Sequence, residues 1–178
     1  TYDGNGNVLV SGSDSIQQAI DNAEPGATIA VDGGTYEEQL TIDKEGISLV
    51  AGDGTPRVKY GDGVVVQIRA ANVSVSGFEI VGGATFDRGN LGMDVRSTPG
   101  GASVEVTDTT FEDLYLGIQT GSGGAHSFVV ENATVNNSVA GFGHQSETGS
   151  AVVQDSHISV NTQGVGLYKA NNALVENN

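Results

Sequence analysis

Hydrophobic residues recur in a fixed frame through much of the chain. Between residues 73 and 158 a hydrophobic residue is followed four times by another five positions later, and a fifth copy begins at Val175. A second hydrophobic column recurs in step with the first. Self-similarity with a period of about 20 to 50 residues is typical of solenoids, in which each unit buries its apolar face only against its neighbours. The pairs are Val75/Ile80, Val106/Phe111, Val130/Val135 and Val153/Ile158, and the second column is Met93, Ile118, Phe142 and Val165.

The local spacing indicates which kind of solenoid this is. Segments such as Val73-Ser74-Val75 and Val104-Glu105-Val106 alternate apolar with polar residues, which is the period of a β-strand. Two or three short strands in each repeat of 22 to 25 residues correspond to one turn of a parallel β-helix. Successive turns of such a coil stack about 4.8 Å apart. We therefore predict an all-β fold, a parallel β-helix of roughly six turns.

Two further columns are predicted to form corners of the coil. Asp and Asn tolerate left-handed backbone conformations, and glycine has no Cβ to obstruct a tight bend. One column lies two residues after each first-column valine, and the other precedes each residue of the second hydrophobic column. The members are Gly77, Asp108, Asn132, Asp155 and Asn177 in the first, and Gly92, Gly117, Gly141 and Gly164 in the second.

A short amphipathic helix is predicted ahead of the first long strand. Ser15 and Gln18 have the spacing of a capping box, and four apolar residues share one helical face before Pro25. Such a helix would close the end of the coil, where bare strand edges invite pairing with other chains. We divide the chain into an N-terminal segment with this capping helix (1–26) and a single-domain β-helix (27–178) whose C-terminal end is expected to be uncapped.

Three segments of the N-terminal region resemble a known family. Residues 15–29, 34–38 and 47–52 resemble the N-terminal region of right-handed parallel β-helix proteins of the pectin-lyase-like superfamily. The later turns resemble the short β-helix repeats of that superfamily and of NosD-type periplasmic proteins. The resemblance covers roughly residues 13–178 and implies a right-handed, single-stranded coil. It implies no single activity, because family members include lyases, hydrolases, epimerases, adhesins and viral tailspikes.

The catalytic motifs of the family's enzymes are not found in the sequence. Gly143-His144-Gln145 is the nearest match to the Gly-His-Gly motif of polygalacturonase-like hydrolases, and no Arg-Ile-Lys motif follows it. The Asp-Pro-His motif of mannuronan epimerases is also missing. The resemblance therefore predicts the fold and leaves the chemistry to be argued from the chain's own residues.

One polar surface is a candidate binding site. If the second hydrophobic column points inward, strand alternation turns polar residues of four turns to the outside. Amides, a guanidinium and an aromatic ring are useful groups for binding saccharides, and the insertion with Phe86-Asp87-Arg88 is expected at the same edge. The alternative is an ordinary solvated face with an Asp94–Arg96 ion pair. The predicted substrate-binding residues are Asp94, Arg96, Gln119, Gln145 and Tyr168.

The net charge of the chain indicates the environment in which the protein works and limits its possible partners. Acidic residues outnumber basic ones by 22 to 7, which gives a formal net charge of −15. Self-repulsion of this kind destabilises a compact chain at low salt, and salt screens it. We expect a halophilic, haloarchaeal source, with an ordinary acidic secreted protein as the alternative. The charge excludes nucleic acid as a partner, because phosphate binding needs Lys and Arg.

Several smaller observations favour an extracellular or cell-surface location. The chain has no long apolar run, so membrane insertion is not expected, and it begins with Thr1, as a mature form would after removal of a leader. Three Asn-x-Ser/Thr sequons are compatible with surface glycosylation. The candidate glycosylation sites are Asn72, Asn132 and Asn136.

No metal site or cofactor is predicted. The chain has no cysteine, and its three histidines are scattered. His144 shares the parity of the inward column, so a buried or strand-end position is expected for it. Calcium held by Asp and Glu remains possible, although no motif of the EF-hand kind supports it.

The last turns suggest either that a further copy of the chain covers the C-terminal end or that the native protein continues beyond Asn178. Residues 173–178 begin a turn as earlier repeats do, and no capping segment follows in the sequence. Outward apolar residues of three turns would also stack into a column that could form a lateral contact. The interface candidates are Val129, Val152 and Leu174.

These observations lead to one main functional hypothesis and two alternatives. The main hypothesis is a non-enzymatic structural or adhesive protein that presents an elongated face to glycans or to copies of itself. The first alternative is a lyase or epimerase acting on an acidic exopolysaccharide, with Arg96 or Lys169 as the base and Asp94 near the sugar. The second alternative is a virion receptor-binding protein of the tailspike kind.

Overall fold

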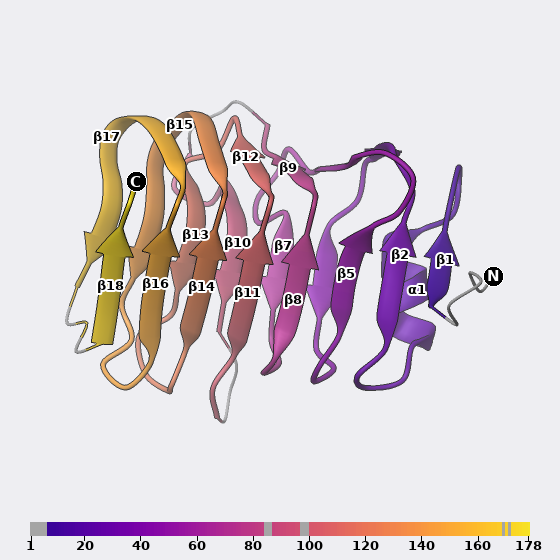
Figure 1. Cartoon of the computed structure of the whole chain (residues 1–178), viewed down its shortest axis with the longest axis horizontal. Helices are drawn as coiled ribbons and strands as arrows, with labels where there is room; N and C mark the ends of the chain where they lie inside the picture. Colours follow the sequence, from indigo (N-terminus) through magenta and orange to yellow (C-terminus); the bar gives the residue numbers. More distant parts are fainter. Residues whose placement is uncertain (1–6, 84–86, 97–99, 169, 171) are drawn as a thin grey trace.

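The computed structural model describes residues 7–83, 87–96, 100–168, 170 and 172–178. Parallel strands stack into a coil of about seven turns, which confirms the predicted all-β parallel solenoid (Figure 1). The first face is a sheet of eight strands. These are β1 (Val8–Val10), β2 (Thr28–Val31), β5 (Ser48–Ala51), β8 (Val73–Ser76), β11 (Ser103–Thr107), β14 (Ser127–Glu131), β16 (Ser150–Gln154) and β18 (Asn172–Glu176).

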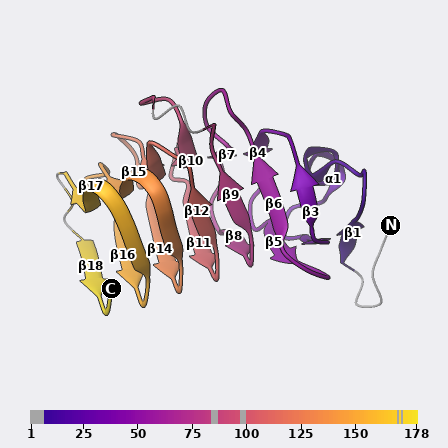
Figure 2. The same ribbon diagram turned by 90° about the horizontal axis from the view of Figure 1, so that it is seen from above.

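The other two faces belong to one sheet that bends around a corner (Figure 2). Two long strands, β15 (Thr134–His144) and β17 (His157–Leu167), run through both faces and join them. The second face contains β3 (Gly34–Tyr36), β6 (Pro56–Lys59), β9 (Glu79–Val81) and β12 (Thr110–Glu112). The third face contains β4 (Leu40–Ile42), β7 (Val66–Ile68), β10 (Leu91–Val95) and β13 (Leu116–Thr120).

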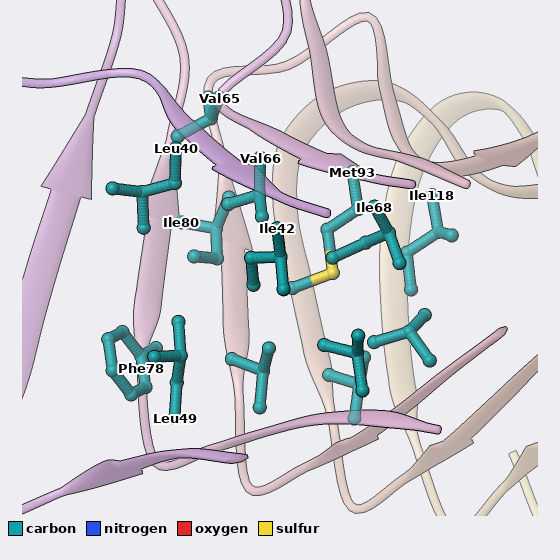
Figure 3. Packing of buried hydrophobic residues seen from close by; sticks show 14 of the residues in the cluster. Leu40, Ile42, Leu49, Val65, Val66, Ile68, Phe78, Ile80, Met93 and Ile118 are labelled. Atoms are coloured by element: carbon teal, nitrogen blue, oxygen red, sulfur yellow. The ribbon is translucent and has the colours of Figure 1, made fainter. Parts of the chain in front are cut away.

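The predicted hydrophobic columns are confirmed as stacks inside the coil. Val106 pairs with Val75 and Val130, and Met93 pairs with Ile118 one turn later. Figure 3 shows such side chains filling the space between the faces. Phe142 contacts the ring of Phe111 edge-on, with centroids 5.7 Å apart, a geometry that adds to the area that both rings bury.

The Asp and Asn column forms the predicted left-handed corners. The φ angles of Asp108, Asn132, Asp155 and Asn177 lie between 50° and 55°. Asn132 also donates its side-chain amide to the carboxylate of Asp108 one turn earlier. Such a ladder satisfies polar side chains at a position that most residues cannot adopt without strain.

The second glycine column has a different physical cause. Its members lie inside strands and lack positive φ angles, so they are not left-handed corners. A Cβ on Gly117 would lie 2.7 Å from the carbonyl oxygen of Gly141. Close approach of neighbouring backbones, rather than a special φ, therefore requires glycine here.

A short helix, α1 (Ile16–Asn22), covers the N-terminal end of the third face, as predicted. Ser15 is the N-cap, and its Oγ accepts from the amide of Gln18 at 3.1 Å. The Glu38 carboxylate accepts from the free amides of Ile16 and Gln17 at 2.8 and 3.1 Å. A residue from the first full turn thus completes the cap, which is a contact that the local capping-box pattern does not contain.

The same helix pairs with the exposed edge of β4. The amide of Thr41 donates to Gln17 Oε1 at 2.7 Å, and Gln17 Nε2 donates to the carbonyl of Thr41 at 3.2 Å. At the other end of α1, Lys44 Nζ donates to the carbonyls of Ile20 and Asp21 at 3.0 and 2.6 Å. Side chains therefore replace the neighbouring strand that β4 lacks on this side.

Within the described residues, no helix is long and apolar enough to cross a membrane.

Candidate functional site

A groove of about 560 Å³ lies on the third face, over the last three turns. Its walls come from β13, from the second halves of β15 and β17, and from the loop that carries Arg88 between β9 and β10. The side chains that line it are mainly amides, hydroxyls and aromatic rings. They include Tyr115, Gln119, Gln145, Thr162, Gln163 and Tyr168.

Two outward-facing glycines form the floor of this groove. Gly143 and Gly166 continue the column that begins with Asp94 and Gln119, in the register predicted for this face. A Cβ on Gly143 would lie 3.2 Å from Leu116 Cδ2, and one on Gly166 would lie 3.0 Å from Gln163 Oε1. Because these two positions carry no side chain, the sheet surface is recessed between its neighbours.

The groove differs in charge from the rest of the molecule. None of the 14 described residues that line it is acidic, although the chain carries 22 Asp and Glu. Three other hollows on the described surface each contain an acid, namely Asp14 in one, Asp62 with Asp87 in the second, and Glu105 in the third. In a chain of net charge −15, the groove is thus a place where an anionic ligand avoids close repulsion.

Beside the groove, Asp94 is held between two arginines. Its side chain is only 4% exposed, and Arg96 Nε donates to Oδ1 at 2.6 Å. Arg69 Nη1 lies 3.8 Å from the other carboxylate oxygen, and Arg69 Nη2 donates to Gln67 Oε1 at 2.6 Å. The two guanidinium groups outnumber the one carboxylate, so this cluster carries one net positive charge.

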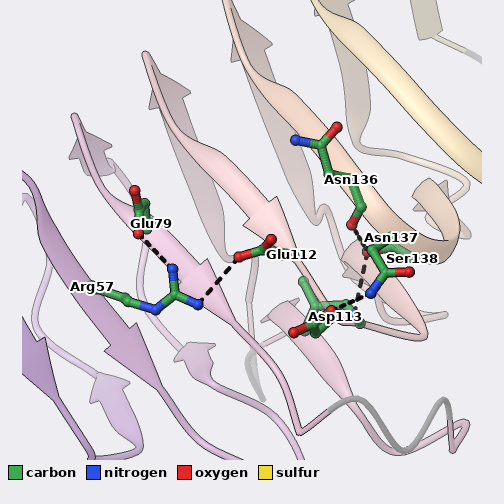
Figure 4. A network of polar contacts seen from close by, with 8 residues as sticks. Arg57, Glu79, Glu112, Asp113, Asn136, Asn137 and Ser138 are labelled. Atoms are coloured by element: carbon green, nitrogen blue, oxygen red, sulfur yellow. Dashed lines mark hydrogen bonds and ion pairs between the residues drawn. The ribbon is translucent and has the colours of Figure 1, made fainter.

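The remaining paired arginine lies on a different face. Figure 4 shows Arg57 on β6 bridging Glu79 on β9, at 2.8 Å, and Glu112 on β12, at 3.2 Å. The hydrogen bond that Arg57 donates to the Glu79 carboxylate raises the pKa of the guanidinium. This ladder links three turns of the second face and has no part in the groove.

A buried histidine lies below the groove, as the sequence predicted. His144 is 1% exposed, with Nδ1 3.1 Å from Thr120 Oγ1 and its ring edge-on to Phe128. Within the described residues, its Nε2 has no hydrogen-bond partner. Burial lowers the pKa of His144, and the nearby His126 lowers it further, so the ring is neutral at pH 7.

The structure brings together only part of the predicted binding surface. Gln119, Gln145 and Tyr168 line the groove, whereas Asp94 and Arg96 lie next to it and are not among its lining residues. Lys169 and Phe86 lie outside the described residues. The binding roles of the five predicted residues stay predictions.

Sequence reasoning did not single out several residues at this site. Tyr115 and Gln163 enter the groove from positions next to the predicted columns. Arg69 was also missed, although it follows Ile68 as Arg96 follows Val95, and these two strand residues are paired. Extending the outward column one turn towards the N-terminus would have found it.

The other predicted surface residues are placed as follows. Val129, Val152 and Leu174 stack in register on the first face, and Leu174 is 46% exposed. Of the sequons, Asn72 donates its side-chain amide to Glu45 at 3.0 Å and Asn132 donates to Asp108. Asn136 lies on β15 in the polar region of the second face that Figure 4 shows. Assembly and glycosylation remain predictions.

The described part of the chain contains no group of three or more His, Cys, Asp or Glu side chains that could hold a metal ion. The expectation that the protein needs no cofactor stays a prediction.

Comparisons with known proteins identify the fold. No protein-family model matches the chain, and no curated protein matches it in sequence. Two crystal structures of the pectin methylesterase from Aspergillus niger are similar to it, each at 14% identity. One has a TM-score of 0.54 and covers 100% of this chain and 87% of the esterase; the other has a TM-score of 0.56 and covers 99% and 86%. At this identity the likeness establishes the fold, the right-handed parallel β-helix that the family resemblance implied.

The same finding corrects the main functional hypothesis. The similar structures are enzymes named for an action on pectin, a polysaccharide. They contradict the expectation of a non-enzymatic structural or adhesive protein and favour the carbohydrate-processing alternative. That hypothesis gave too much weight to missing motifs, because the absence of one enzyme's catalytic residues does not exclude another chemistry on the same fold.

Proposed function

We propose that the chain is a carbohydrate-active β-helix protein that binds and processes an acidic polysaccharide in the groove of the third face. The observation that carries this proposal is that the described residues of the groove lining include no acid, with arginine at the groove's edge, in a chain of net charge −15. A site that must accept a polyanion needs such a region, since the remaining surface repels it.

The lining side chains support a sugar ligand. Tyr115 and Tyr168 offer aromatic rings, and Gln119 and Gln145 offer amides that both donate and accept hydrogen bonds. The groove volume of about 560 Å³ lies within the range of about 300 to 1,000 Å³ typical of ligand sites.

The ion pair between Asp94 and Arg96 limits the role that Arg96 can have in a reaction. Arg96 is ion-paired with Asp94 at 2.6 Å, and a guanidinium has donors but no acceptor, so it is a poor general base. Arg96 is better suited to attract an anionic sugar while Asp94 fixes its orientation. Elimination at a uronate and hydrolysis of an ester on a uronate are both chemistries to test, the latter because pectin methylesterases share the fold.

The setting is also part of the proposal. Polysaccharides of this kind are encountered outside cells, so we propose an extracellular or cell-surface location. The excess of 22 acidic over 7 basic residues supports a saline environment, in which screening reduces repulsion between protein and polymer.

Purified protein in multi-molar KCl, offered polygalacturonate, methyl-esterified pectin and alginate, tests this function. Binding is measured by affinity electrophoresis, elimination by absorbance at 235 nm, and ester hydrolysis by methanol release. We expect binding and one of the two reactions, and a tenfold or larger loss of turnover in Arg96→Ala and in the double variant Gln119→Ala/Gln145→Ala. Lys59→Gln, on the exposed second face, is the control. If the wild-type protein neither binds nor alters any acidic polymer, the proposed function is wrong.

A further inference from the structure

The four arginines of the chain differ in what they contact. Arg57 is paired with Glu79 and Glu112, while Arg69 and Arg96 share Asp94. Arg88 is exposed, and no carboxylate of the described residues forms an ion pair with it. Its guanidinium therefore keeps its donors available for a ligand without first breaking an internal contact.

Arg88 also has a particular position. It lines the groove together with Tyr115 and Gln119, and it lines a second hollow of about 490 Å³ formed by the loops before β7 and β10. The two hollows thus share this residue. A polymer that occupies both would pass over Arg88.

The two hollows differ in charge on either side of Arg88. The groove has no acidic lining residue, whereas Asp62 and Asp87 line the second hollow. A negatively charged group is repelled on the second side and is tolerated on the first. The anionic group of a bound sugar therefore fits on the groove side of Arg88.

The chemistry of the side chain indicates which anion it would take. A guanidinium presents a planar fork of donors that matches the two oxygens of a carboxylate, and such bidentate pairs are directional as well as strong. We propose that Arg88 is the specificity-determining residue of this site and recognises the carboxylate of a uronate unit bound in the groove. This inference rests on the proposed function, since it names the group by which the same site selects its substrate.

The test compares one polymer in two charge states. Polygalacturonate and the same polymer after methyl esterification differ at the carboxylate, and affinity for each is measured by affinity electrophoresis at fixed salt. We expect wild-type protein to bind the free-acid form at least tenfold more tightly. Arg88→Gln should lose most of this preference, and Arg88→Lys should recover part of it, because lysine keeps the charge but not the planar fork.

Two comparisons separate this inference from the loss of fold or of function. Lys59→Gln removes one positive charge from the exposed second face, as Arg88→Gln does from the groove, and should keep the wild-type preference. Equal thermal midpoints of the two variants would show that the fold is intact. If wild-type protein prefers the free acid and Arg88→Gln keeps that preference, the role of Arg88 is wrong while the proposed function stands. If wild-type protein binds neither polymer, the role of Arg88 is wrong, and the proposed function is wrong as well if alginate is also neither bound nor altered.

Discussion

His144 is a basic side chain in a position where its charged form is unfavourable. The ring is 1% exposed, and within the described residues Nε2 has no hydrogen-bond partner. Burial lowers its pKa below the ordinary value of about 6.5, and the backbone of Gly149 and Ser146 offsets only part of this effect. Protonation would place a charge among the buried side chains that support the groove floor.

The pH dependence of stability follows from that position. The pKa of His144 is lower in the folded than in the unfolded chain, so the unfolded chain binds a proton first as the pH falls. The contribution of the neutral ring to stability is therefore complete above about pH 6.5 and is lost as the pH falls below that value. We expect the free energy of unfolding in urea to fall between pH 7 and pH 5. His144→Gln should reduce this slope, whereas His157→Gln, at an exposed position, should keep it. An unchanged slope in His144→Gln would refute this explanation.

At the scale of elements, the coil begins with a helix whose cap is supplied from elsewhere in the chain. Glu38 accepts from the amides of Ile16 and Gln17 and from the hydroxyl of Ser15, the last at 2.7 Å. The three contacts tie α1 to the segment between β3 and β4. The helix has only 7 residues, too few for stability by itself, so it depends on these contacts together with the burial of Ile16 and Ile20.

Removing the Glu38 carboxylate should lower the free energy of unfolding by more than the loss of one negative charge would. We expect Glu38→Ala to lower the free energy of unfolding by about 1 kcal/mol or more, since a lost helix cap typically costs about 0.5 to 2 kcal/mol. Glu37→Ala removes the same charge from an exposed neighbour and should change stability by less than about 0.5 kcal/mol. Urea unfolding of both variants checks this, and equal losses would contradict it.

Some features of these elements could be predicted from the sequence, and others could not. Columns such as Val106 and Met93 were predictable, because stacking in register repeats the same environment every turn. Asn132 and its equivalents were predictable for the same reason. The contacts of Glu38 and Arg69 were not, because each depends on how a side chain reaches across turns, which periodicity does not encode. The groove was found in part: its outward column was predicted, but its recess depends on loop positions and on Gly143 and Gly166.

At the scale of the whole molecule, the main imbalance is the excess of acidic over basic residues. Each of the 22 acids adds to a repulsion that only 7 basic residues offset. The screening length falls from about 10 Å at 0.1 M salt to about 3 Å at 1 M, so salt suppresses this repulsion progressively. It also weakens the exposed Arg57 ladder, but exposed pairs contribute little to stability.

Stability should therefore increase with salt. We expect the thermal midpoint to rise by at least about 4 °C between 0.05 and 1 M KCl, which corresponds to about 1 to 2 kcal/mol for a chain of this size. The triple variant Glu24→Gln/Glu37→Gln/Asp53→Asn changes three exposed acids and brings the net charge from −15 to −12, and should respond less. A midpoint that stays constant or falls in KCl would contradict this account.

The pairing of each strand with strands only one turn away has a consequence for the length of the groove. A turn inserted between β15 and β17 would meet the same neighbours on either side as the turns already there. It would lengthen the groove by about 4.8 Å and leave α1 and the first turns undisturbed. The length of the groove therefore depends on how many turns carry it, and each further copy of this repeat would extend it.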